Sequence, residues 1–279
     1  MGTSTSSNGP NGGVSFDPPW LDEIEMPGST TSSDASKEND LGLQDEDIDN
    51  TKINIAPPRR FSATRRALNN YAQSGDSDSL RKALGHYSRT GMGGARNVAN
   101  RMRTSTKSAS ALFGVLRSAR EGNDPEINEW VSTLTSRNAS ADEILDEIIN
   151  MVTPFGGSID EISCRESMAQ ALENLIINNP QIDLLNLKDN DIWNIIESFL
   201  SYEAFNRLCL DIGQSFEKSS LAPKIKVARM NEMHSYLESE IFIQVEKLRE
   251  SSENFTPNQL NDILQDALSN TFYVYEGAL

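Results

Sequence analysis

The chain has 279 residues, 37% of them hydrophobic, and a formal net charge of −16. This length is sufficient to bury a sizeable core. No apolar run approaches the roughly 18 residues of a membrane span, and no basic start precedes an apolar stretch, so we expect neither a span nor a secretory signal. Cys164 and Cys209 fit no metal or redox spacing, and we expect them to be buried thiols of a soluble, cytoplasmic protein.

The charge is distributed unevenly along the chain. Residues 1–57 hold 11 acidic residues and 2 lysines, for a charge of −9. Residues 58–120 hold 13 Lys and Arg residues and 2 Asp residues, for +11, and residues 121–279 hold 28 acidic and 10 basic residues, for −18. We therefore divide the chain into an acidic tail, a basic helical module and an acidic helical domain. This asymmetry indicates an anionic partner, or attraction between the segments themselves.

Residues 1–57 are predicted to form a long disordered tail. They are rich in Ser, Thr, Gly, Asn and Asp, so they bury too little apolar surface to offset the lost chain entropy. One segment differs, "FDPPWLDEIEMP" at 16–27, in which an aromatic residue follows two prolines among acidic residues. It predicts a short docking motif whose contact residues are Pro18, Pro19, Trp20 and Leu21. The alternative is chance apolar content within a tail.

From residue 58 onward the apolar spacing is helical. We expect a helix over 62–75, with Ser62 as N-cap and Gly75 as its end, and a second helix that ends at Gly91. Residues 94–122 predict one further helix with a break near Ser105–Ser108. Capping-box sequences at 140–143, 158–161 and 256–259 begin later helices. Alternating strand patterns are nearly absent, so the expected fold is all-α behind a disordered tail.

Motifs for catalysis, metals and cofactors are not found in the sequence. "GMGGAR" at 91–96 resembles a phosphate-binding loop, but Arg96 stands where the last glycine is required and no strand precedes it. His86 and His234 lie far apart and fit no zinc pattern, so we expect structural histidines. The carboxylates of 121–279 fall on polar helix faces, which indicates solvated surfaces. We therefore expect a protein that is not an enzyme and holds no metal or cofactor.

The basic module has three possible binding modes. Its cations could neutralise phosphates while Tyr71 and Tyr87 stack on bases, although no recognised nucleic-acid motif accompanies them. They could instead dock on an acidic protein, or pack against the acidic part of the same chain. Arg65 and Arg66 are the residues we expect to contact a partner protein.

Three stretches carry a resemblance to a known family. "MGTSTSSNGP" at the start, "PPWLD" at 18–22, and "RRFSATRRAL…SGDSDSLRKALGHYSRTGMGGARNVANRM" through 59–102 resemble the QatB proteins of bacterial Qat anti-phage operons. The resemblance implies a four-protein system. It consists of an ATPase (QatA), QatB, a relative of the 7-deazaguanine enzyme QueC (QatC) and a TatD-like nuclease (QatD). The family has no well-described catalytic motif, which implies a defence component that acts through partners.

The resemblance gives the second residue a role. QueC-type enzymes use ATP to adenylate the carboxylate of a 7-deazaguanine, which an amine then attacks. This implies that Gly2, freed by removal of Met1, is docked in the QatC-like partner or receives a covalent 7-deazaguanine. Thr3 and Ser4 would lie beside it in the partner's channel. The alternatives are an ordinary leader, and a myristoylation pattern formed by Gly2 and Ser6 that a bacterial context would make accidental.

Overall fold

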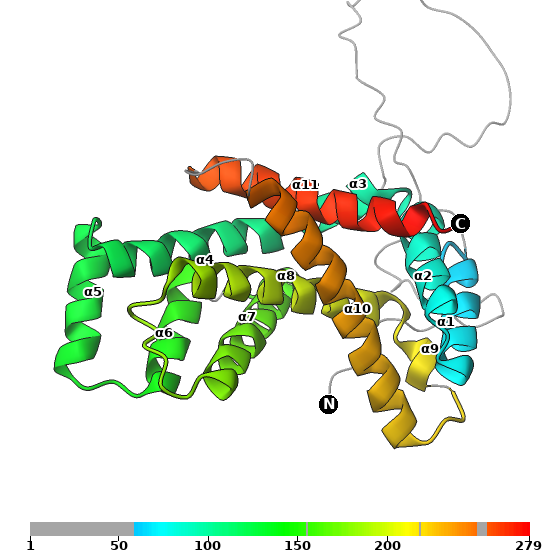
Figure 1. The fold of residues 1–279 in the computed structure, drawn as a ribbon, viewed down its shortest axis with the longest axis horizontal. Helices are drawn as coiled ribbons and strands as arrows, with labels where there is room; N and C mark the ends of the chain where they lie inside the picture. The colour runs from blue at the N-terminus through cyan, green and yellow to red at the C-terminus, as the bar shows by residue number, and fades with distance from the viewer. Residues whose placement is uncertain (1–58, 155, 218, 250–255) are drawn as a thin grey trace, which may run out of the picture. The chain divides into compact units, whose positions relative to one another are not determined.

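The computed structural model describes residues 59–154, 156–217, 219–249 and 256–279. All regular elements within these ranges are helices, so the all-α prediction is confirmed for them (Figure 1). The predicted disordered tail lies outside the described residues. None of the helices described is long and apolar enough to cross a membrane.

The basic segment folds into short helices followed by one long helix. They are α1 (Ser62–Ser74), α2 (Ser77–His86), the π-helix η2 (Tyr87–Met92), α3 (Ala95–Arg101) and α4 (Arg103–Glu121).

The acidic segment supplies the remaining helices. They are α5 (Pro125–Ser136), α6 (Ala141–Val152), α7 (Ile159–Asn178), α8 (Asp189–Ile212), α9 (Gln214–Glu217), α10 (Pro223–Arg249) and α11 (Pro257–Glu276). Residues 58–279 belong to a single compact unit, to which both charge-defined segments contribute helices. The boundary that we placed at residue 120 falls in the last turn of α4.

Local signals place four of the predicted helix ends correctly. The three predicted capping boxes are present at the starts of α6, α7 and α11, where Ser140, Ser158 and Thr256 accept backbone N–H groups. Gly75 ends α1 as predicted, with a φ of 71° that favours glycine. These signals are read correctly because each acts over only a few residues.

Three local predictions are wrong. Ser62 is the first residue of α1 rather than its N-cap, since Phe61 precedes the helix and no side chain caps it. Gly91 does not end a helix but lies inside η2, which ends at Met92 with Gly93 as its C-cap. The break expected at Ser105–Ser108 lies at Met102, between α3 and α4.

The position of that break follows from contacts with α11. Met102 is buried at the bend, where its N–H reaches the carbonyl oxygens of Val98 and Ala99. The Thr106 hydroxyl donates to Asn261 Oδ1 at 2.8 Å and accepts from Gln265 Nε2 at 2.8 Å. Because α11 satisfies its side chain, this Ser/Thr-rich run remains helical.

Two clusters of buried apolar side chains make up the core. The larger cluster packs α4, α7, α8 and α11 together with α6 and one end of α10. The smaller cluster joins α1, α2, η2 and α3 to the C-terminal ends of α8 and α11 and to the middle of α10. Helices of the basic segment therefore pack directly on helices of the acidic segment.

Helix α8 contributes to both clusters. Its first four turns, from Ile192 to Ala204, belong to the larger cluster, and Leu208 and Ile212 belong to the smaller one. Figure 1 shows α8 lying among α4, α7 and α10, all of which pack on it. Of its 24 residues 13 are buried, whereas Asn194 and Leu210 are exposed.

A buried ion pair lies where the two clusters meet on α8. Glu203 is fully buried, and its carboxylate accepts from Arg207 Nε at 2.8 Å and from the hydroxyls of Ser163 and Ser167 at 3.0 Å. Arg207 also donates to Asp160 Oδ1 at 2.6 Å. The expectation of solvated carboxylates is therefore wrong for Glu203, because its face of α8 packs against α7 and leaves it no exposed surface.

We expect Arg207→Ala to lower the free energy of unfolding by about 3–5 kcal/mol, since it leaves the Glu203 carboxylate buried without its cation. Urea denaturation followed by circular dichroism measures this loss. Arg137→Ala is the matched control, because the Arg137–Glu147 pair at 3.3 Å is about half exposed and such pairs contribute about 0–1 kcal/mol. Equal losses in the two variants would contradict the prediction.

Candidate partner-docking surface

Helix α1 separates an apolar face from a basic one. Thr64, Leu68 and Tyr71 recur at the spacing of one helix face and are buried, Leu68 and Tyr71 in the smaller cluster. Arg65 and Arg66 lie away from that face, Arg66 exposed and Arg65 partly so. The structure thus keeps both predicted partner-contact residues at the surface of α1.

Most cations of the basic segment have no ionic partner within the described part of the chain. Those without a carboxylate in salt-bridge range there are Arg59, Arg60, Arg65, Arg66, Arg81, Lys82, Arg89, Arg96, Arg103 and Lys107. Arg60 lies over the ring of Phe61, 4.7 Å from its centroid. These side chains leave a surface with a large excess of positive charge.

Only a few ion pairs connect the basic segment to the acidic helices. Arg101 pairs with Asp211 at 3.0 Å, and Arg120 pairs with Asp189 at 2.6 Å. Within the described residues, these ion pairs therefore neutralise a small part of the basic charge. Most of the contact between the basic segment and the acidic helices comes from apolar packing in the smaller cluster. For the unpaired cations, two of the binding modes expected from the sequence therefore remain: neutralising nucleic-acid phosphates and docking on an acidic protein.

Tyr71 and Tyr87 are core residues and cannot stack on nucleic-acid bases. Both side chains are almost fully buried. The Tyr71 hydroxyl donates to the Arg229 carbonyl at 3.0 Å and to Glu232 Oε2 at 3.1 Å, and the Tyr87 hydroxyl donates to Asp211 Oδ2 at 2.8 Å. Burial raises the pKa of both phenols. The base-stacking part of the nucleic-acid hypothesis is therefore wrong.

The turn after α1 is tightly fitted against α10. A Cβ on Gly75 would meet the guanidinium of Arg229, which pairs with Glu232 at 2.7 Å and lies 5.8 Å from the centre of the Tyr71 ring. Glycine at this position lets α10 approach α1 closely. Helix α1, which carries the basic face, is thereby packed against α10.

The segment "GMGGAR" has a structural role. Gly94 has a φ of 116°, and its N–H donates to the Ser88 carbonyl at 2.9 Å, which links η2 to α3. The helix that follows has only seven residues.

The histidines and cysteines form no cluster. His234 stacks on Tyr202 with ring centroids 4.3 Å apart, and burial lowers its pKa. Both thiols are free, and burial raises the pKa of Cys164 and of Cys209 to about 12. Among the residues with described positions, no group of His, Cys, Asp and Glu side chains is arranged to hold a metal ion.

The remaining predicted site residues cannot be placed. Gly2, Thr3, Ser4 and the docking motif from Pro18 to Leu21 lie outside the described residues.

A family comparison identifies the chain. The profile of the family described as "Qat anti-phage system associated protein QatB" matches residues 93–275. The chain belongs to the QatB family. Membership gives it a role in anti-phage defence and associates it with the other proteins of the Qat system. No curated protein and no solved structure shows significant similarity to the chain.

The QatB match covers a different part of the chain from the resemblance seen in the sequence. It spans α3 to α11, whereas the motifs that resemble QatB lie in the first 22 residues and at 59–102. The two overlap only at 93–102. The acidic helices thus carry most of the family match, and Arg65 and Arg66 lie N-terminal to it.

Proposed function

We propose that this QatB-family protein is a non-enzymatic defence component that binds a QueC-like partner, QatC, and presents Gly2 to it. The observation that carries the proposal is the basic surface of α1 to α4, where most cations have no ionic partner among the described residues. Charged groups left unpaired on a surface steer association with a partner of opposite charge. Arg65 and Arg66 are the contact residues on α1.

The amine chemistry favours a terminal glycine as acceptor. Adenylation of the 7-deazaguanine carboxylate by ATP releases pyrophosphate, and attack by the amine forms an amide and releases AMP. At pH 7 an α-amine is about 10% neutral, whereas a lysine amine is below about 0.1% neutral. Gly2 also has no side chain to obstruct a narrow channel, and the neighbouring Thr3 and Ser4 are small and uncharged.

The proposal places the protein in the bacterial cytoplasm, where ATP is available. Its other partners would be the QatA-like ATPase and the QatD-like nuclease of the same system. It requires no metal and no cofactor on this chain other than the 7-deazaguanine attached to Gly2.

The second candidate function is a nucleic-acid-binding adaptor that brings the nuclease or the ATPase to phage DNA. The same unpaired cations favour it, because they could neutralise phosphates without reading bases. Residues 58–120 pack on α8, α10 and α11, so the full chain is needed to compare the two candidates.

Reversing two charges on α1 separates the two functions. We expect Arg65→Glu/Arg66→Glu to weaken assembly with the QatC-like protein while the helix content stays unchanged, since neither residue has an ionic partner in the described structure. Lys188→Glu/Lys224→Glu, which makes the same charge change at two exposed lysines outside residues 58–120, is the matched control. Co-purification measures assembly, and titration with DNA at several salt concentrations measures phosphate binding. Normal assembly with lost DNA affinity would favour the adaptor.

The tail motif can be tested by removing its aromatic residue. Large rigid aromatic side chains dominate short interfaces, so Trp20→Ala should weaken binding to the QatC-like partner by on the order of 2 kcal/mol. Isothermal titration calorimetry measures the affinity, and Leu43→Ala, elsewhere in the tail, is the control. An unchanged affinity for the Trp20 variant would exclude docking through this motif.

The modification of Gly2 can be read by mass spectrometry of the N-terminal peptide. We expect a free amine when the protein is expressed alone, and a 7-deazaguanine amide when the partner, ATP and the nucleobase acid are present. Gly2→Pro should abolish the amide although Met1 is still removed, because its terminal amine is secondary and ring-constrained. Gly2→Glu should retain Met1, and Gly12→Pro should be modified normally. An unmodified Gly2 in protein from an intact, functional operon would refute the conjugation and leave docking alone.

A further inference from the structure

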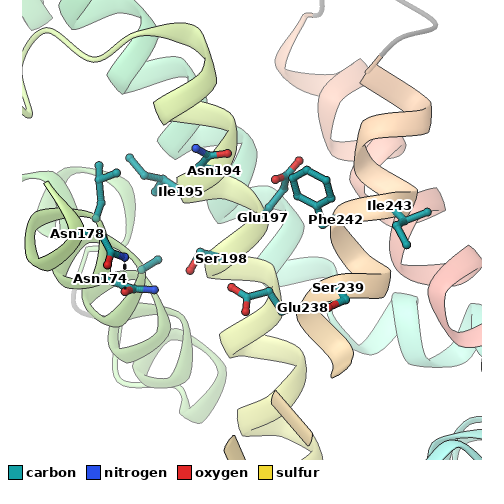
Figure 2. A pocket seen from close by; sticks show the side chains of 12 residues that line it. Asn174, Asn178, Asn194, Ile195, Glu197, Ser198, Glu238, Ser239, Phe242 and Ile243 are labelled. Atoms are coloured by element: carbon teal, nitrogen blue, oxygen red, sulfur yellow. Dashed lines mark hydrogen bonds between the residues drawn. The ribbon is translucent and has the colours of Figure 1, made fainter. Parts of the chain in front are cut away.

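A groove runs between α7, α8 and α10, on helices that lie within the QatB match. It encloses about 590 Å³, which is in the range of small-ligand sites. Figure 2 shows α8 along its floor, with side chains of α7 on one side and of α10 on the other. None of the sequence motifs pointed to this groove.

The groove contains a buried carboxyl group with an unsatisfied oxygen. Glu197 is only 4% exposed, and its Oε1 has no hydrogen-bond partner among the described residues. The Ser198 hydroxyl beside it is likewise unsatisfied. A buried polar atom without a partner costs about 1–3 kcal/mol, so a donor that filled this position would recover stability.

The charged groups acting on Glu197 all come from α10. Burial raises the pKa of Glu197 to about 8, the neighbouring Glu246 raises it further, and Arg249 opposes the shift. Glu238, also on α10 and lining the groove, has its pKa raised by burial. The α7 wall contributes amide groups, with Asn178 Nδ2 donating to Asn174 Oδ1 at 2.9 Å.

Apolar side chains stand exposed at the α10 wall. Phe242 is 46% exposed and Ile243 is 44% exposed. In Figure 2 the Phe242 ring lies beside the Glu197 carboxyl group. A half-exposed ring can turn outward at little cost in core packing, and this movement would open a path to Glu197.

We propose that this groove docks a short segment of a partner protein that presents an arginine or lysine side chain, its charged end at Glu197, beside an apolar residue that packs on Phe242 and Ile243. The assignment follows from charge and size. The net charge of −18 over residues 121–279, which include Glu238 in the groove, disfavours an anionic occupant. The enclosed volume exceeds that of one side chain, so a peptide fits better than a small free cation. This inference does not depend on Gly2 or on the basic face of α1.

Docking of a cation should release a proton. With its pKa near 8, Glu197 is mostly protonated at pH 7 and must ionise to pair with the incoming charge. Linkage then predicts proton release at pH 7 that falls as the pH rises above the pKa of Glu197, and an affinity that increases over the same range. The arginine of the peptide stays charged throughout this pH range, so the change in affinity and in proton release comes from the protein.

The experiment uses the full chain and the tripeptide Ac-Leu-Arg-Leu-NH2 as probe. Isothermal titration calorimetry in two buffers of different ionisation enthalpy gives both the affinity and the protons released. The same peptide with citrulline, a neutral isostere of arginine, is the matched ligand control. We expect binding and proton release with the arginine peptide, and neither with the citrulline peptide.

Two pairs of variants assign the site. Glu197→Gln preserves the shape of the protonated side chain and should reduce affinity at least about tenfold, with no proton release, while Glu166→Gln, on the exposed side of α7, should change nothing. Phe242→Ala should weaken binding, whereas Tyr273→Ala, a similarly exposed aromatic residue on α11, should not.

Several results would overturn the proposal. These are no binding of the arginine peptide, equal binding of the citrulline peptide, unchanged binding to Glu197→Gln, or binding without proton release at pH 7. Agmatine, which carries a guanidinium group on an alkyl chain, tests the peptide requirement. If agmatine bound as tightly as the tripeptide, the groove would be a site for small cations rather than for a protein segment.

Discussion

Helix α8 packs in both hydrophobic clusters along its length, and the arrangement of the other helices depends on this double packing. Its N-terminal turns pack in the larger cluster, and its last turns pack with α1, α2 and α11 in the smaller one. Polar residues on such a helix need partners inside the protein. The Glu203–Arg207 pair, with Ser163 and Ser167 on α7, meets this need at the junction.

The opposite charges of the two segments contribute little to holding them together. Apolar packing does most of it, with the Tyr71 and Tyr87 hydroxyls bonded to acidic residues of α10 and α8. The acidic helices leave most arginines of α1 to α4 without an ion pair within the described structure, and this is the observation behind the docking proposal.

The family match and the candidate docking surface occupy different parts of the unit. The QatB match covers α3 to α11, which include the α8 core and the groove at Glu197. Arg65 and Arg66 lie before it, on the helix that follows the tail directly. The two proposed binding sites therefore lie on different parts of the chain.

The sequence by itself determined the features that depend on near neighbours. Capping boxes at Ser140, Ser158 and Thr256, the end of α1 at Gly75 and the all-α class follow from interactions within one or two turns, so they could be predicted. The exposure of Arg65 and Arg66 could be predicted in the same way, from helical spacing.

Only the tertiary structure decided the features that depend on distant helices. The bend at Met102 instead of Ser105 arises because α11, some 155 residues later, satisfies Thr106. The burial of Tyr71 and Tyr87 depends on acceptors on α10 and α8, and the exposed-looking spacing of Glu197 gave no sign that α10 would cover it. The local sequence around a carboxylate or a phenol is the same whether its side chain is exposed to water or covered by another helix. The contact that buries it forms only when distant parts of the chain pack together.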